Sequence, residues 1–228
     1  MFRYLRVAIV AGALIVTSLG MTAAASTSAP DQHAGHAGMA ESDKTSAEAF
    51  RAEMRRLWEE HIVWTRQYIV SAATLKGDLP DIGPTAARLF ANQTDIGVAI
   101  APFYGDAAGA ALTELLNDHI AIAADAIAQA KAGKTAALQA ALDRWYANAD
   151  DIAAFLAAAN PESWPFDAMS RHMRGHLDLT LAEAVARLGG DYQADIVAYD
   201  QVHAQILQMA DMLSAGIINQ FPQRFTQH

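Results

Sequence analysis

Apolar residues recur every three or four positions along almost the whole chain from residue 46 onward, and no segment alternates between apolar and polar residues as a strand would. Glycine and proline interrupt this pattern, which predicts helices over about 47–75, 84–100, 106–132, 135–159, 167–188 and 191–221. Short connections between long amphipathic helices favour antiparallel neighbours. The sequence therefore predicts an all-α fold: an up-and-down antiparallel helical bundle of about six helices with a four-helix-bundle-like core.

Alternate helices carry the same local string, which indicates an internal repeat of a helical hairpin. The first helix of each hairpin contains a histidine, namely in Glu60-His61-Ile62, Asp118-His119-Ile120 and Gly175-His176-Leu177, and these histidines are 58 and 57 positions apart. The second helix carries Asn-x-x-Asp-Ile, as Asn92 to Ile96 and Asn148 to Ile152, displaced by 56 positions, with a looser copy at Tyr192 to Ile196. The bundle is thus predicted to be built from repeated hairpins.

The repeated histidines, together with a fourth at His203, lie on the apolar stripes of their helices and are expected to face the bundle interior. A single buried histidine is typically satisfied by a neighbouring polar group, but several imidazoles and carboxylates in one core are costly to bury unless they are paired or coordinated. Metal coordination explains their convergence, and His–Asp hydrogen bonds are the alternative. The candidate metal ligands are His61, Asp95, His119, Asp151, His176 and His203.

Composition narrows the chemistry that the chain can support. Its 228 residues include 16 Lys and Arg against 25 Asp and Glu, a formal charge of −9, which leaves no basic surface for nucleic acid. The chain has no cysteine, which excludes disulfides, thiolate zinc sites, iron–sulfur clusters and covalently attached haem. Nitrogen and oxygen ligands without thiolate suit iron, copper or zinc without choosing among them.

Residues 1–25 are interpreted as a cleaved signal peptide, which predicts export to the periplasm. Arg3 and Arg6 precede an apolar run from Val7 to Val16, and Ala23 to Ala25 supply the small residues of a cleavage site. The apolar stretch is shorter than a membrane-spanning helix needs, so no stable membrane span is expected after cleavage, which takes the charge from −9 to −11.

Residues 26–45 are expected to form a flexible linker, followed by a bundle domain over 46–228. The linker contains His33, His36 and Met39. Two imidazoles and a thioether on a flexible strand could capture copper, and a solvated tail without a function fits the same composition equally well.

Three strings resemble a family of small exported bacterial helical bundles without an established activity: Leu57 to Arg66, Trp145 to Leu156, and Met209 to Met212. The resemblance spans nearly all of residues 54–222 and implies the all-α fold. Some members of the family carry the transferred label acetylglutamate kinase, which this sequence contradicts because it has neither a phosphate-binding loop nor an α/β pattern.

The leading hypothesis from the sequence is a periplasmic metal-binding bundle that serves storage or homeostasis and binds a metal ion through core histidines and aspartates. No nucleophile or separate acid–base pair stands out, so whether the protein is an enzyme stays open. One alternative is a non-catalytic bundle that binds haem or an organic ligand. The other is a structural or partner-binding protein whose core histidines are satisfied by His–Asp hydrogen bonds, and a homodimer also stays open.

Overall fold

Six helices account for most of the computed structural model, which describes residues 45–74 and 77–226, and they confirm the predicted all-α bundle. The helices are α1 (Ala47–Ala72), α2 (Ile82–Tyr104), α3 (Asp106–Lys131), α4 (Thr135–Ala159), α5 (Phe166–Leu188) and α6 (Tyr192–Gln220). The signal peptide and the segment with His33, His36 and Met39 lie outside the described residues.

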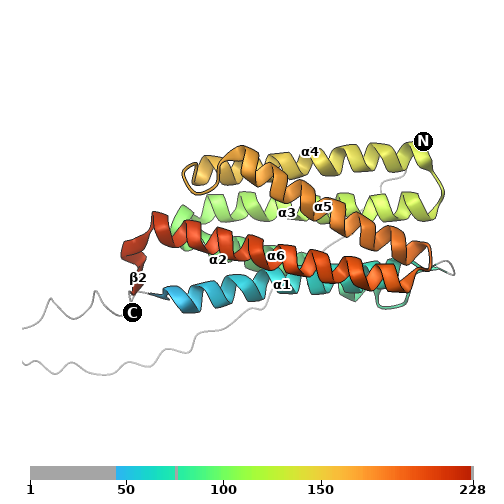
Figure 1. The fold of residues 1–228 in the computed structure, drawn as a ribbon, viewed down its shortest axis with the longest axis horizontal. Coiled ribbons are helices and arrows are strands. Elements are labelled where there is room, and N and C mark those ends of the chain that lie inside the picture. The colour runs from blue at the N-terminus through green and yellow to red at the C-terminus, as the bar shows by residue number, and fades with distance from the viewer. Residues whose placement is uncertain (1–44, 75–76, 227–228) are drawn as a thin grey trace, which may run out of the picture. The chain divides into compact units, whose positions relative to one another are not determined.

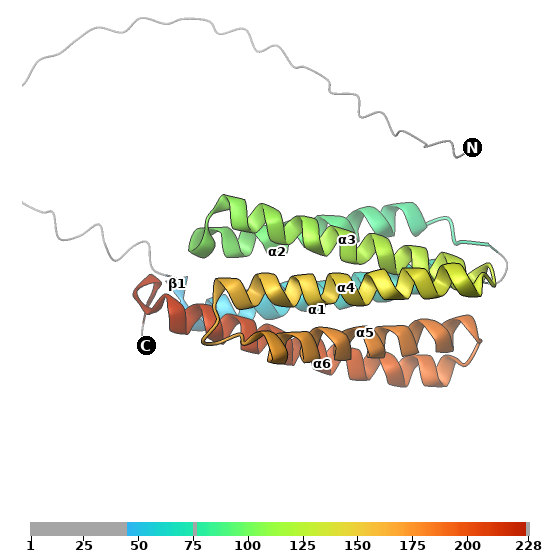
Figure 2. The ribbon, with the colours of Figure 1, turned by 90° about the horizontal axis from the view of Figure 1, so that it is seen from above.

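The helices run along a common long axis, and successive helices lie side by side in opposite directions (Figures 1 and 2). Each helix packs against the next, and α6 returns to pack against α1, so that the six helices close around one core. In addition, α1 contacts both α3 and α5, the first helices of the other two hairpins. These contacts bring the three histidine-bearing helices together at the centre of the bundle.

Two of the six helices have a side-chain N-cap, and the end of α2 departs from the sequence prediction. Ser46 and Asp191 cap α1 and α6 by accepting hydrogen bonds from the backbone amides of Ala49 and Ala194. The second helix was expected to end near residue 100, before Pro102, but it continues to Tyr104. Pro102 lacks a backbone N–H, so the carbonyl of Val98, four residues earlier, loses its helical hydrogen bond. Val98 is exposed, so water can hydrate this carbonyl, and the last turn of α2 tolerates the proline.

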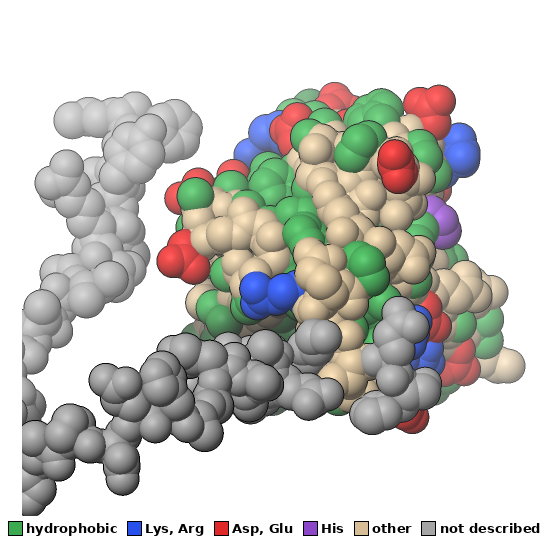
Figure 3. All heavy atoms as spheres, turned by 90° about the vertical axis from the view of Figure 1, so that its left-hand side faces the viewer, with side chains coloured by type: hydrophobic (Ala, Val, Ile, Leu, Met, Phe, Trp, Pro, Cys, Tyr) green, Lys and Arg blue, Asp and Glu red, His purple; other side chains and the backbone are tan. Residues whose placement is uncertain are grey.

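The chain ends of the domain meet at one end of the bundle. Strand β1 (Thr45–Ser46) pairs in parallel with β2 (Phe225–Thr226), which follows a short 3₁₀ helix, η1 (Pro222–Arg224). Phe225 is buried and stacks on Phe103, with ring centres 5.5 Å apart. Apolar side chains and backbone cover much of this end, with acidic and basic side chains spread around them (Figure 3). The two strands thereby cover the end of the core.

Within the described part of the chain, no helix is long and apolar enough to cross a membrane.

Candidate functional site

Three of the predicted ligands meet in the middle of the bundle. His61 on α1, His119 on α3 and His176 on α5 are each 2% exposed. The ring centre of His176 lies 5.8 Å from that of His61 and 6.1 Å from that of His119. These three side chains form a buried polar layer, which we call the histidine layer.

The second helix of each hairpin supports this layer through a side-chain amide. Three amide NH₂ groups each donate to the backbone carbonyl that lies four residues before a histidine: Asn92 to Leu57 (3.0 Å), Asn148 to Leu115 (3.1 Å) and Gln205 to His172 (3.1 Å). The same long-range contact is therefore made three times. The repeat seen in the sequence corresponds to a repeated packing unit of two helices.

The orientation of the Asn148 amide determines which nitrogen of His119 carries the proton. Because the NH₂ group of Asn148 donates to the Leu115 carbonyl, its oxygen is the atom 2.9 Å from Nδ1 of His119. An amide oxygen can only accept a hydrogen bond. Nδ1 of His119 is therefore the donor, and Nε2 of this neutral ring keeps an unshared electron pair.

The same reasoning applies to His61 through Gln93, a residue that the sequence analysis missed. Nε2 of Gln93 donates to the Leu89 carbonyl at 2.8 Å, and Oε1 lies 3.2 Å from Nδ1 of His61. Gln93 is fully buried and lies four residues after Leu89 and three before Ile96. That position on the apolar stripe of α2 is the signal that could have identified it.

His176 is the member of the layer whose hydrogen bonds are incomplete. Its Nδ1 is buried without a hydrogen-bond partner, and so is Oε1 of Gln205. Gln205 nevertheless lies close enough to His176 to raise the pKa of the imidazole, against the larger effect of burial. Gln205 thus lies beside His176 as Gln93 and Asn148 lie beside the other two histidines. The looser copy of the repeat expected at Tyr192 to Ile196 is therefore not the structural counterpart of the Asn-x-x-Asp-Ile strings.

Burial keeps all three imidazoles neutral. Desolvation, together with the neighbouring His119, lowers the pKa of His61 to about 3, and desolvation lowers the pKa of His119 to about 4. Burial also lowers the pKa of His176 well below its ordinary value, with His61 and His119 acting in the same direction. At neutral pH the layer therefore contains three uncharged rings, the form of histidine that binds metal ions.

Two indole rings border the layer. Trp58 lies against His61 and Trp145 against His119, with ring centres 5.8 and 5.3 Å apart. Both indole nitrogens are buried, and neither has a hydrogen-bond partner within the described part of the chain. The layer therefore lies between two buried indole rings.

The expectation that Asp95 and Asp151 face the bundle interior is wrong, because both are exposed. The buried face of α2 passes through Asn92, Gln93 and Ile96, and Asp95 precedes Ile96 by one position, which is about 100° around the helix. Asp151 precedes a buried isoleucine in the same way on α4. The asparagines of the Asn-x-x-Asp-Ile repeat point inward, and its aspartates lie at the surface.

His203 is not part of the layer. It is half-buried on α6, where its Nε2 lies 2.9 Å from Oε1 of Glu59 and its ring packs beside Tyr199. The residue of α6 that approaches the layer is Gln205, two positions further along the chain, which is about 200° around the helix.

A separate buried ion network lies on α1, α5 and α6. Arg66 donates to Glu183 at 2.9 Å and forms a two-pronged ion pair with the fully buried Asp195, which also contacts Arg187 at 3.3 Å. Burial raises the pKa of Glu183 despite the neighbouring Arg66. The two carboxylates are thus compensated by arginines.

As the side chains stand, no three His, Asp or Glu residues of the described segments are arranged to hold a metal ion. No protein-family model, curated protein or solved structure matches the chain. The histidine layer is therefore the basis for the proposed function.

Proposed function

We propose that this protein is a periplasmic metal-binding bundle that holds one transition-metal ion in the histidine layer. The observation that carries the proposal is the hydrogen bonding of His61 and His119, in which an amide oxygen on the neighbouring helix occupies Nδ1 and leaves Nε2 free as a ligand. Hydrogen bonds of this kind to the second nitrogen orient histidine ligands in metal sites. Three neutral imidazoles then supply three ligand atoms.

Binding requires a small contraction of the layer. Metal–nitrogen distances of about 2.0–2.1 Å would place the centres of ligand rings roughly 5.2–5.5 Å apart in tetrahedral or trigonal sites. The ring centre of His176 lies 5.8 Å from that of His61 and 6.1 Å from that of His119, so each of these two distances would have to shorten by less than about 1 Å. The unpaired Nδ1 of His176 leaves that ring the least constrained of the three.

Charge favours copper(I) among iron, copper and zinc. The imidazoles are neutral, and the buried carboxylates Glu183 and Asp195 are already paired with arginines. The cost of burying an ion rises with the square of its charge, so a monovalent ion is the least unfavourable. Methionines 54, 173 and 209 line a cavity of about 20 Å³ on one side of the layer, and thioethers are soft ligands that suit copper(I).

The size of the adjoining cavities argues against the haem alternative. The two cavities lined by residues one helical turn from the layer measure about 70 and 20 Å³. Both are smaller than the roughly 150 Å³ that accommodates a single benzene ring, and a haem is several times larger than benzene.

The proposal is tested by anaerobic copper(I) titration of the purified protein, without an affinity tag, against a chromophoric chelator. The layer variant is H61Q/H119Q, and the control is H172Q/H203Q, which removes the same number of imidazoles outside the layer. We expect one equivalent of tightly bound copper(I) in the wild type and the control, and at least a 100-fold weaker affinity in the layer variant.

Far-UV circular dichroism checks that the layer variant is folded, and H33Q/H36Q isolates any contribution from the N-terminal segment. Copper affinity that survives in a folded layer variant would contradict the proposal, and affinity that disappears with H33Q/H36Q alone would assign binding to the segment instead. Zinc and iron(II) titrations under the same conditions test the argument from charge.

A further inference from the structure

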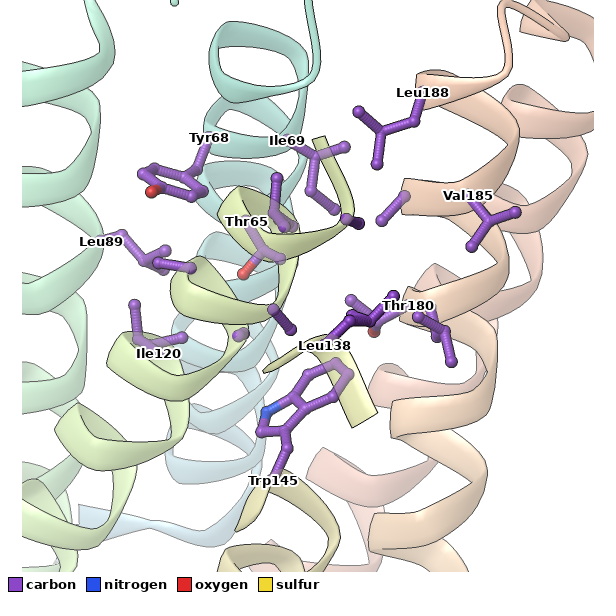
Figure 4. Close-up of a pocket in the computed structure, with 17 residues that line it drawn as sticks. Thr65, Tyr68, Ile69, Leu89, Ile120, Leu138, Trp145, Thr180, Val185 and Leu188 are labelled. Atoms are coloured by element: carbon purple, nitrogen blue, oxygen red, sulfur yellow. The ribbon is translucent and has the colours of Figure 1, made fainter. Parts of the chain in front are cut away.

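A cavity of about 70 Å³ lies on the other side of the histidine layer from the methionines, between α1, α3, α4 and α5 (Figure 4). Thr65, Ala123 and Thr180 line it, and each lies four residues after a histidine of the layer. The cavity therefore begins one helical turn above all three imidazoles. No step of the proposed metal binding requires it.

The walls of the cavity are almost entirely apolar. Most of the lining is contributed by Ala, Leu, Ile and Val side chains. The hydroxyls of Thr65 and Thr180 donate to the carbonyls of His61 and His176, at 2.7 and 2.9 Å. These hydroxyl protons are engaged within their own helices. Such a lining excludes charged ligands, which would lose their hydration without compensation.

The indole of Trp145 also lines the cavity (Figure 4) and packs against His119, with ring centres 5.3 Å apart. Its Nε1 is buried within the protein and is closed off from the cavity. The polar groups of the lining residues therefore offer the cavity almost no surface.

We propose that this cavity binds a small, neutral and apolar molecule of two to about four heavy atoms, such as a diatomic gas. The volume sets the size, because it is about half of the roughly 150 Å³ that accommodates benzene in an apolar protein cavity. Water fits the site poorly, since a buried water needs two to four polar partners and the lining is almost entirely apolar.

A molecule in this position lies beside the face of the histidine layer. In the metal-loaded protein it can therefore contact an ion held by His61, His119 and His176, and only this contact rests on the proposed function. Binding in the cavity itself depends on its volume and its apolar lining, and is expected with or without metal.

Xenon tests the cavity in the metal-free protein. Methyl resonances of Ile69, Ile120 and Leu188, which line the cavity, are followed by NMR under xenon pressure in the wild type and in A123L, which fills the volume. The matched control is A121L, at an exposed position two residues away on α3. If A123L does not fold, A126V removes part of the same volume.

We expect saturable shifts of these methyl resonances in the wild type and A121L, and at least a tenfold weaker response in the filled variant. The absence of xenon-dependent shifts in the wild type, or equal shifts in A123L and A121L, would overturn the proposal.

Carbon monoxide then tests contact with the metal, by infrared spectroscopy of the copper(I)-loaded protein. We expect a bound C–O stretching band that A123L abolishes and that A121L retains. If copper binds and xenon enters but no such band forms, the contact with the metal is refuted and the proposed function stands. If copper does not bind, the proposed function fails, and the xenon result still decides the cavity.

Discussion

Acidification is expected to destabilise the protein through the histidine layer. The pKa of His61 is lowered to about 3 and that of His119 to about 4 in the folded state, against about 6.5 in an unfolded chain. Between these values the unfolded state binds more protons, so the stability is fully present above pH 6.5 and is lost as the pH falls toward the folded-state pKa values.

These two pKa values set the magnitude of the loss. Between pH 7.5 and pH 5.0 each of these two imidazoles removes about 2 kcal/mol from the free energy of unfolding, or about 4 kcal/mol together. Burial shifts the pKa of His176 in the same direction, so it adds to this loss. Domains of this kind are typically stable by about 5–15 kcal/mol, which makes the expected loss a large share of the total.

Urea unfolding followed by far-UV circular dichroism at both pH values measures the loss. In H119Q, which keeps a polar side chain beside Asn148 but does not titrate, the loss between pH 7.5 and 5.0 is expected to be about 2 kcal/mol smaller than in the wild type. A121L, at an exposed position without a titrating group, is expected to show the wild-type loss. The raised pKa of Glu183 acts in the opposite sense in every variant and cancels from the comparison.

The reasoning is refuted if H119Q loses as much stability between pH 7.5 and 5.0 as the wild type does. That outcome would mean that the folded protein protonates these rings as easily as the unfolded chain does, which is incompatible with a buried layer.

Two further predictions concern packing and the ion network. G97A is expected to lower the free energy of unfolding in urea by at least about 1–3 kcal/mol, because a Cβ there would lie 2.5 Å from a backbone carbonyl oxygen of α3. At Gly175 a Cβ meets nothing within 4 Å, so G175A should leave stability unchanged or raise it by up to about 1 kcal/mol. R66M is expected to lower the free energy of unfolding by about 3–5 kcal/mol, because it removes an arginine that pairs with the buried carboxylates of Glu183 and Asp195. R55M removes an exposed ion pair with Asp211 and should lower it by less than about 1 kcal/mol. Equal costs within either pair would contradict the packing or burial assigned to that position.

Local sequence signals were sufficient to predict the helices, and the repeat identified the residues of the layer. The first helices of the three hairpins run in the same direction, so histidines spaced by 58 and 57 residues return to one level of the bundle. The sequence did not determine whether the histidines share a level, because that depends on how far neighbouring helices are staggered. The nearly constant spacing of the histidines was the signal for a common level.

The polar partners of the layer could not be assigned in the same way. From the sequence we expected the aspartates of the Asn-x-x-Asp-Ile repeat and His203 to join the histidines in the bundle interior. The structure instead places Gln93, Asn148 and Gln205 beside the histidines. Adjacent positions on a helix are separated by about 100°, so a small rotation of α2 or α6 about its axis decides which polar residue is buried. That rotation is determined by packing across the whole bundle.

The central claim is that three neutral imidazoles of the histidine layer form one metal site. Long-range ¹H–¹⁵N correlation NMR of the histidine rings, recorded before and after one equivalent of copper(I), tests it most directly. We expect His61 and His119 to be neutral with the proton on Nδ1, and the Nε2 resonances of His61, His119 and His176 to shift together on metal addition. A proton on Nε2 of His61 or His119 in the metal-free protein would contradict the claim. Metal-dependent shifts confined to histidines outside the layer would contradict it as well.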